Sequence, residues 1–386
     1  MKKIFFVILI AICCIFIPTL GASASANIIN ENLKTQSKSA ILIEANTGTT
    51  IYSSNENSRL PIASMTKIML LNLCFENINK GNLKLDEEIT VSKNASGMGG
   101  SQVFLEANCK YKVCDLIKSV IIASANDASV ALAEKLYGSE TNCVKEMNHK
   151  CLEWGLKNTL FSNCTGLPKP TQYSSAKDVS FMLSKLIKNK EYFKYSNIWM
   201  DEIKHEKGNV TGLTNTNKLI KYYDGCDGGK TGFTKESGHC LAATAKRGNM
   251  RLISVVICAP DSKTRFADVS NMFNYGFDNY ACKMVVDNKK PLEIDVKINK
   301  SKCDKVEVVA KEPVFIFSEK NVKDNVLIDF SPNRNVAPMK KGDVVGELKV
   351  FKDNVEYKKV KVVLCHDVDD KTYFDYIVDI GRNWGI

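Results

Sequence analysis

Histidine and tryptophan are scarce in this chain, with four and three residues respectively among 386. The four histidines are not spaced like zinc ligands. His205-Glu206 starts like a zinc-protease motif, but Asn209 stands where that motif needs its second histidine. The G-x-S-x-G pattern of a serine-hydrolase elbow is also absent, which disfavours a Ser-His-Asp triad. We therefore expect neither a metal centre nor a cofactor.

Apolar runs that could span a bilayer are missing after the first 26 residues. Those residues begin with Lys2 and Lys3, continue with an apolar run over 4–17, and end in small residues over 22–26. This order is typical of a secretory signal peptide, which we assign to residues 1–26. A lipoprotein site at Cys13 or Cys14 is the weaker alternative. We expect an exported protein that works in the cell envelope, at the outer face of the membrane.

A C-x-x-C pair is also missing, although the chain has 14 cysteines, 12 of them after residue 26. Export favours disulfides. A chain of this length can build a core without them, however, and the cysteines are scattered through apolar segments. We favour buried free thiols and keep disulfides as the alternative.

Acidic residues are outnumbered, with 43 Asp and Glu against 53 Lys and Arg, which gives a net charge of +10. A modest positive excess suits contact with an anionic envelope. We find no basic stripe with interleaved aromatics, and export also argues against a nucleic-acid partner.

The chain divides near residues 285–290. Before this point helical and strand patterns alternate. We expect a hairpin over 41–54, a central strand over 251–259 and helices over 64–78, 115–123, 128–137 and 264–280. After it, segments of period two such as LEIDVKI, PVFIF and KKVKVVL predict a small all-β domain. We therefore predict an α/β domain over 27–285, a β domain over 290–370 and a tail over 371–386.

Three short motifs stand out in the first domain. Ser64-Met65-Thr66-Lys67 opens an apolar segment expected to be a helix. Ser124-Ala125-Asn126 follows in an expected break between two helices, and Lys230-Thr231-Gly232 comes just before the expected strand GHCLAATAK. S-x-x-K and S-x-N also occur elsewhere in the chain, so the ordered set carries the argument and no single motif does. A serine hydroxyl needs a base within reach, and a lysine three residues later lies on the same helix face.

This ordered set resembles that of the penicillin-binding proteins and serine β-lactamases. Longer stretches, among them RLPIASMTKIML, IIASANDASVALAE and GGKTGFTKESGHCLAATAKR, resemble the D-alanyl-D-alanine carboxypeptidases, the low-molecular-mass penicillin-binding proteins. The resemblance covers nearly the whole chain after residue 26. It implies an α/β (α+β) fold: a β-lactamase/transpeptidase-like catalytic domain with a central antiparallel sheet flanked by helices, then a small β-sandwich.

The resemblance also implies catalytic roles. Ser64 would be the nucleophile and Lys67 its base, which acts only when neutral. Burial and the nearby Lys230 would lower the pKa of Lys67. Ser124 would relay a proton to the leaving amine, and Asn126 would bind the substrate backbone or Lys67.

Substrate-binding roles follow in the same way. Lys230 and Thr231 would hold the terminal carboxylate of the substrate, and Gly232 would let the strand edge approach it. The backbone N–H of Phe233 would form an oxyanion hole with that of the nucleophile. Arg265 would be a second carboxylate contact or, equally, a residue in a surface salt bridge.

The activity implied is removal of the terminal D-Ala from peptidoglycan pentapeptides through an acyl-enzyme, in wall biosynthesis, remodelling and cell shape. β-Lactams would acylate the same serine. A β-lactamase is the nearest alternative, but the stretch closest to its Glu-x-x-Leu-Asn pattern begins at Glu153 and ends in Lys157. A D,D-endopeptidase and a slow penicillin-binding sensor are the others. The tail has apolar residues near helical spacing, mixed with charges, so we expect at most weak membrane contact.

Overall fold

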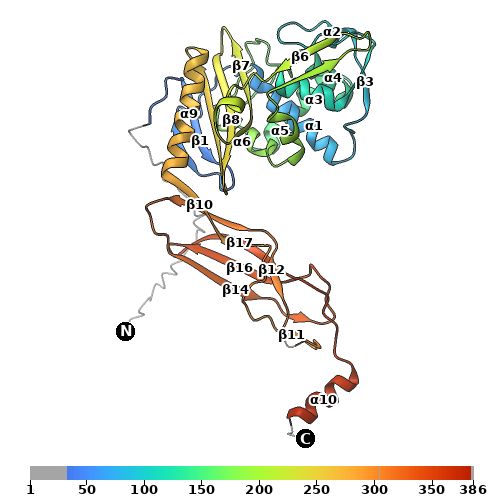
Figure 1. Ribbon diagram of the computed structural model, residues 1–386, viewed down its shortest axis with the longest axis vertical. Coiled ribbons are helices and arrows are strands. Elements are labelled where there is room, and N and C mark those ends of the chain that lie inside the picture. Colours follow the sequence, from blue (N-terminus) through green and yellow to red (C-terminus); the bar gives the residue numbers. More distant parts are fainter. Residues whose placement is uncertain (1–32, 304, 384–386) are drawn as a thin grey trace, which may run out of the picture.

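The computed structural model describes residues 33–303 and 305–383, so the expected signal peptide lies outside the described residues. The chain forms two parts that lie end to end, with a terminal helix beyond them (Figure 1). The first is an α/β part that holds the three motifs, and the second is built of strands. This is the predicted α/β architecture with a C-terminal β domain. The exact division at 285–290 stays a prediction.

A five-stranded antiparallel sheet lies at the centre of the α/β part. Its strand order is β2 (Thr50–Ser54), β1 (Ser39–Glu44), β9 (Met250–Ala259), β8 (Gly238–Arg247) and β7 (Cys226–Thr234). The expected hairpin over 41–54 is β1–β2, and the expected central strand is β9. Since β7 is an edge strand, one side of its backbone is free to meet a substrate.

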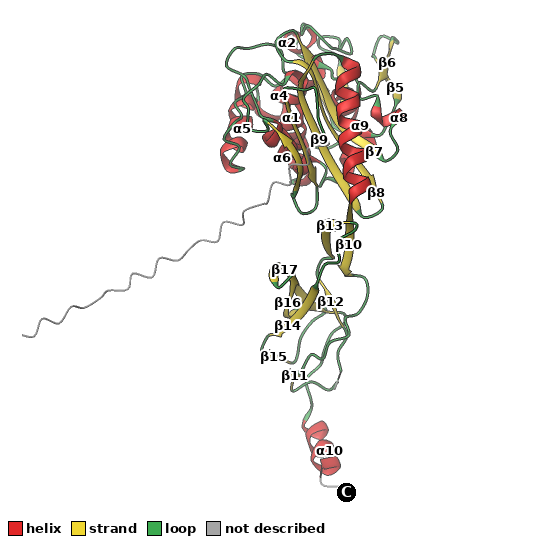
Figure 2. Cartoon of the chain, turned by 90° about the vertical axis from the view of Figure 1, so that its left-hand side faces the viewer, coloured by secondary structure: helices red, strands yellow, loops and turns green. Residues whose placement is uncertain are grey.

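Alternate side chains of the sheet pack into two different cores. Ile41 and Ile43 of β1 face the helical core, whereas Ala40 and Leu42 face α9 (Ser262–Asn279). Figure 2 shows α9 on one side of the sheet and α1, α4 and α6 on the other. Both faces are thereby covered, which explains why β8 and β9 read as nearly continuous apolar runs.

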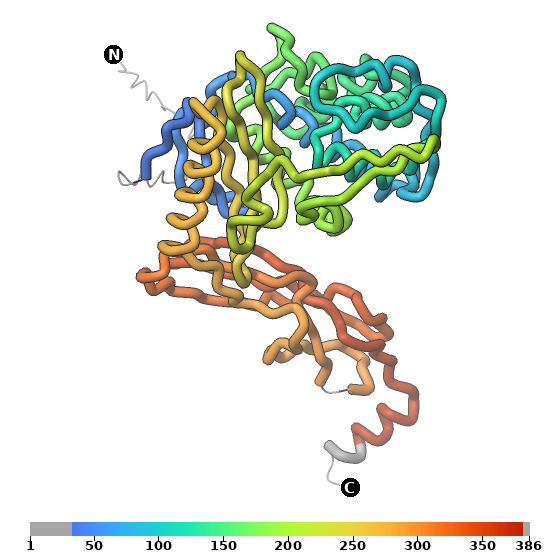
Figure 3. Tube along the Cα trace, turned by 45° about the horizontal axis from the view of Figure 1, so that its top comes forward, coloured from blue at the N-terminus to red at the C-terminus, as the bar shows by residue number. Residues whose placement is uncertain are grey.

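Most of the α/β part consists of the helices and short strands between β2 and β7. Figure 3 shows hairpin β5–β6 running along the segment around residue 110, where His205 Nδ1 and the Tyr111 hydroxyl are 2.8 Å apart. The elements in this stretch are η1 (Ala63–Thr66), α1 (Lys67–Asn79), β3 (Glu88–Thr90), α2 (Lys93–Ser96), β4 (Lys110–Lys112), α3 (Val113–Ile122), α4 (Asn126–Tyr137), α5 (Glu140–Glu153), α6 (Ala176–Leu186), η2 (Lys190–Tyr192), α7 (Phe193–Ser196), β5 (Met200–Lys204), β6 (Val210–Thr214) and α8 (Leu219–Tyr222).

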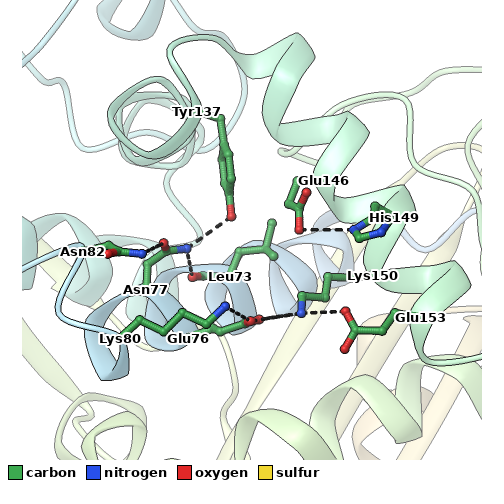
Figure 4. A network of polar contacts seen from close by, with 10 residues as sticks. All are labelled: Leu73, Glu76, Asn77, Lys80, Asn82, Tyr137, Glu146, His149, Lys150 and Glu153. Atoms are coloured by element: carbon green, nitrogen blue, oxygen red, sulfur yellow. Dashed lines mark hydrogen bonds and ion pairs between the residues drawn. The ribbon is translucent and has the colours of Figure 1, made fainter.

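Polar contacts hold α1 against its neighbours at its C-terminal half (Figure 4). Asn77 Nδ2 donates to the Tyr137 hydroxyl of α4 at 3.2 Å. The Lys150 ammonium of α5 lies 2.9 Å from the Glu76 carboxylate and 2.8 Å from that of Glu153. Lys150 is buried, so this charge cluster is screened less than a surface pair. The helix that begins with Lys67 is therefore fixed from two sides.

The second part has its own apolar core. A four-stranded sheet runs in the order β12, β17, β16, β14, with two smaller pairs, β10–β13 and β11–β15. Residues 292–297 were expected to form a strand but are irregular, because the backbone there pairs only locally. The elements are β10 (Tyr280–Val286), β11 (Ile298–Asn299), β12 (Val308–Ala310), β13 (Val314–Glu319), β14 (Val326–Pro332), β15 (Asn335–Val336), β16 (Val344–Lys352), β17 (Val355–Leu364) and α10 (Tyr373–Asn383).

Candidate active site

Ser64 lies in a 3-10 turn, η1, directly before α1. We expected Ser64 to begin the helix, but the helix begins at Lys67. Ala63 adopts a positive φ of 46°, and the residues that follow form the tighter turn. Such a backbone is costly for a non-glycine residue and is found mostly where a side chain must be presented in one direction. The turn places the Ser64 hydroxyl 3.0 Å from the Lys67 amine.

The Lys67 amine is fully buried and has three oxygen partners. Its Nζ lies 2.7 Å from Asn126 Oδ1, 2.5 Å from the carbonyl oxygen of Thr165 and 3.0 Å from Ser64 Oγ. Burial lowers the pKa of Lys67 to about 7. A neutral amine has two N–H bonds and one lone pair. The Asn126 and Thr165 oxygens can only accept, so the lone pair is left for the Ser64 hydroxyl.

The second motif lies beside this amine. Ser124 is buried and has a positive φ of 63°. The break expected over 124–127 is shorter than predicted, because α4 already begins at Asn126. Asn126 turns its oxygen to Lys67 and donates its Nδ2 to the carbonyl oxygen of Gly99 at 2.7 Å. The amide orientation is thereby fixed from both ends.

Asp127 supports the second motif and was missed by the sequence analysis. Its buried carboxylate accepts hydrogen bonds from the backbone N–H groups of Val103 and Leu105, each at 3.0 Å, and of Ala128 at 2.9 Å. The carboxylate ties the loop at 99–105 to α4, and its charge partly opposes the effect of burial on the pKa of Lys67. The one cue in the sequence was an acidic residue in the first turn of a helix.

The third motif lies within β7, not before a strand as expected. Lys230 is buried, so the alternative of a solvated edge lysine is wrong. Burial lowers the pKa of Lys230 well below its ordinary value, and repulsion from Lys67 and Arg265 adds to this. We expected Lys230 to lower the pKa of Lys67 as well, but burial is the main cause there. Thr231 is also buried, next to Lys230 on the same strand.

Gly232 brings β7 against the nucleophile turn. A Cβ on Gly232 would lie 2.6 Å from the Ile62 carbonyl oxygen and 3.2 Å from the Ser64 nitrogen. Any side chain here would push the strand away from Ser64. The next residue, Phe233, is 58% exposed, and its ring stacks on that of His239 at 4.3 Å between centroids.

Arg265 reaches the same strand from the first turn of α9. It is buried, and its Nη1 donates to the carbonyl oxygens of Gly232 at 3.2 Å and Cys240 at 3.4 Å. The surface salt-bridge alternative is therefore wrong. Its position places a positive charge beside β7, close enough to affect Lys230.

The segment at 163–166 completes the surroundings of Lys67. Thr165 supplies one of the carbonyl oxygens to the amine. Gly166 has a φ of +85°, and a Cβ there would lie 2.1 Å from the Ala63 carbonyl oxygen and 2.7 Å from the Ser64 nitrogen. We noted the stretch FSNCTGLP in the sequence but assigned it no role, because its contacts with 63–67 are about 100 residues distant along the chain.

Thiols and metal-binding clusters take no visible part in this site. Among residues 33–303 and 305–383, no group of three or more His, Cys, Asp or Glu residues is arranged to hold a metal ion. All twelve cysteines of the described chain are free, and eight of them are buried. Burial raises the pKa of the Cys164 thiol, which lies near Lys67.

Comparison with known proteins places this geometry in context. The family model described as D-alanyl-D-alanine carboxypeptidase matches residues 25–261, and that described as penicillin-binding protein 5, C-terminal domain, matches residues 282–370. The chain is 38% identical to D-alanyl-D-alanine carboxypeptidase DacF of Bacillus subtilis, over all of this chain and 99% of that protein. It is 31% identical to DacA of Haemophilus influenzae, over 88% of this chain and 87% of that protein.

Solved structures show the same likeness. Penicillin-binding protein 5 from Haemophilus influenzae superposes with a TM-score of 0.69 at 28% identity, covering 87% of this chain and 98% of that one. PBP3 from Streptococcus pneumoniae, titled a peptidoglycan synthesis regulatory factor, superposes with a TM-score of 0.74 at 25% identity, covering 87% and 100%. With a family model matched over more than half of its residues and a relative aligned over its whole length, the chain belongs to the D-alanyl-D-alanine carboxypeptidase family of penicillin-binding proteins.

Proposed function

We propose that this chain is a serine-type D-Ala-D-Ala carboxypeptidase of peptidoglycan stem peptides, with Ser64 as nucleophile and Lys67 as base. One observation carries the proposal: Ser64 Oγ lies 3.0 Å from a buried amine whose pKa is about 7. A neutral amine at this distance takes the hydroxyl proton as Oγ attacks the carbonyl carbon of the penultimate D-Ala.

The terminal carboxylate of the substrate binds at Lys230 and Thr231, with Arg265 close by. Without substrate, burial and neighbouring cations favour the neutral amine of Lys230. An arriving carboxylate reverses this balance, because an opposite charge within contact distance favours the ammonium form. The site therefore gains its ion pair when a substrate with a free C-terminus is present, which fits a carboxypeptidase.

Bond cleavage follows from the same geometry. The N–H groups of Ser64 and Phe233 stabilise the oxyanion of the tetrahedral intermediate. The C–N bond then breaks, and the buried Ser124 hydroxyl passes a proton to the departing amine of the terminal D-Ala. Asn126 holds the backbone of the acyl part. Water attacks the ester of Ser64 in the second half of the reaction, and Lys67 again takes the proton.

β-Lactams would act as inhibitors at the same serine. Penicillin-binding protein D2 of Listeria monocytogenes, solved in its ampicillin-bound form, is 30% identical to this chain with a TM-score of 0.57. The family match to carboxypeptidases favours this function over that of a β-lactamase.

The test compares the wild-type chain with Ser64→Ala in release of D-Ala from an acyl-L-Lys-D-Ala-D-Ala peptide and in labelling by fluorescent penicillin. We expect both activities in the wild type and neither in the variant. Ser174→Ala is the matched control, since Ser174 begins a second S-x-x-K pattern whose lysine, Lys177, is exposed. Penicillin labelling without D-Ala release would favour a sensor or an endopeptidase.

We also propose that residues 1–26 direct export to the cell envelope. The basic start, the apolar run and the small residues at 22–26 support this. Expression in a bacterial host should yield an extracytoplasmic chain whose N-terminus follows Ala24 or Ala26. A chain that stays in the cytoplasm with residues 1–26 intact would contradict the proposal.

Weak membrane contact through α10 is the last part of the proposal. No described helix is long and apolar enough to span a membrane. α10 nevertheless exposes large apolar side chains, including Tyr373, Phe374 and Ile377 at 77%, 76% and 48%. A helix of this kind can lie in the membrane interface. We expect Phe374→Ser combined with Ile377→Ser to reduce co-sedimentation with phosphatidylglycerol vesicles. Unchanged sedimentation would exclude this contact.

A further inference from the structure

A cavity of about 350 Å³ lies directly beside the nucleophile turn. Ala63 and Gly166, which touch each other next to Ser64, form its inner end. Thr234 and Glu236, at and beyond the end of β7, form another wall. Its volume is in the range of small-molecule sites. The catalytic residues described above do not line it, so their roles leave its purpose unexplained.

The proposed mechanism fixes which part of the substrate reaches this cavity. The terminal carboxylate lies at Lys230 and Thr231, and the scissile carbonyl lies at the N–H groups of Ser64 and Phe233. The substrate therefore runs antiparallel to β7, and whatever precedes the scissile bond continues past Thr234. The cavity thus lies on the acyl side, at the residues before the two D-Ala units.

The lining of the cavity combines an apolar body with two opposite charges. Its apolar walls come from Pro61, Ile62, Leu167, Pro168 and Pro170. Lys169 lies between two prolines, which restrict its backbone, and the Gln172 N–H donates to its carbonyl oxygen at 3.0 Å. Glu236 lies in a turn closed by hydrogen bonds between Thr234 and Ser237. Both charged side chains are exposed and supported by rigid segments.

We propose that this cavity binds the side chain of the residue before the D-Ala pair, and that Lys169 and Glu236 select a diamino acid whose side chain ends in both an ammonium and a carboxylate. The aliphatic stem of such a side chain fits the apolar walls. Its ammonium pairs with Glu236 and its carboxylate with Lys169. The inference rests on the carboxypeptidase function proposed above and adds to it the substrate class.

The test uses the purified full chain and three acyl peptides that all end in D-Ala-D-Ala. The residue before this pair is Nε-acetyl-L-lysine, L-lysine or meso-2,6-diaminopimelic acid, whose side chains end in no charge, an ammonium, or an ammonium and a carboxylate. We expect kcat/KM for D-Ala release to rise in this order, by about three- to fivefold at each step, as is typical of one exposed ion pair.

Two variants separate the charges. Glu236→Gln should remove the advantage of L-lysine over acetyl-lysine, and Lys169→Gln should remove the advantage of diaminopimelic acid over lysine. Lys235→Gln and Lys177→Gln change exposed charges that do not line the cavity, so both ratios should be retained. Equal rates on all three peptides, or ratios unaffected by the two variants, would overturn the inference and leave the carboxypeptidase function intact. Release from none of the peptides would refute both.

Discussion

Lys67 determines the pH dependence of the proposed reaction. Its amine has a pKa lowered by burial to about 7, so it is mainly protonated below this pH and mainly neutral above it. Only the neutral form can accept the Ser64 proton. We therefore expect kcat/KM for D-Ala release to rise between about pH 6 and 8 and to level off above, since the pH profile of kcat/KM reports the free enzyme.

A guanidinium at this position stays protonated, so Lys67→Arg should lower kcat/KM by about 10²–10⁴-fold and abolish the rise with pH. Lys157→Arg, at an exposed position, is the control and should retain the wild-type profile. A wild-type profile that is flat or falls between pH 6 and 8 would show that Lys67 is not the base.

Residue types and order in the sequence were enough to predict Ser64 and Lys67 as partners, because three residues of spacing bring them together locally. The cause of the lowered pKa was not predictable in this way. It depends on burial by segments far away in the chain, including Thr165, and is opposed by the charge of Asp127. Arg265 is a similar case, since nothing in the local sequence distinguishes a buried arginine from an exposed one.

The contact between the 163–166 segment and η1 positions the nucleophile. A methyl group on Gly166 would collide with the Ala63 carbonyl oxygen, and its φ of +85° disfavours any other residue. We expect Gly166→Ala to displace Ser64 and the Thr165 carbonyl and to lower kcat/KM at least about 100-fold, the cost typical of a 1 Å misplacement. D-Ala release and the thermal unfolding temperature measure the two effects.

Gly208→Ala provides the matched control. Gly208 has a φ of +89°, but a Cβ there meets nothing within 4 Å. This variant should lose stability through backbone strain of about 1–3 kcal/mol and keep its activity. If both variants lose activity equally, strain alone and not the contact with η1 explains the effect.

Secondary structure was predictable where the apolar period was long and local. The hairpin β1–β2, strand β9 and helix α9 lie where the sequence indicated. The 3-10 turn at Ser64 and the placement of Lys230-Thr231-Gly232 inside β7 were not predicted. Both depend on packing of η1 against β7, which local patterns do not contain.

The two parts of the molecule share apolar contacts at their junction. Phe317 of β13 packs in the same core as Leu42 and Phe277 of the α/β part, and its ring stacks on Tyr280 at 5.0 Å. We expect the wild-type chain to unfold in a single calorimetric transition. Phe317→Ala should cost about 3 kcal/mol and separate it into two. Phe330→Ala, within the second core, should lower stability without this separation. Two transitions in the wild type would contradict the coupling.

The central claim is that Ser64 forms the acyl-enzyme, and mass spectrometry tests it most directly. The full chain is incubated with benzylpenicillin, digested and mapped for the added mass. We predict one adduct, on the peptide that contains Ser64, and none in a Lys67→Arg chain treated for the same time. An adduct on another residue, or its absence from a chain that releases D-Ala, would contradict the account.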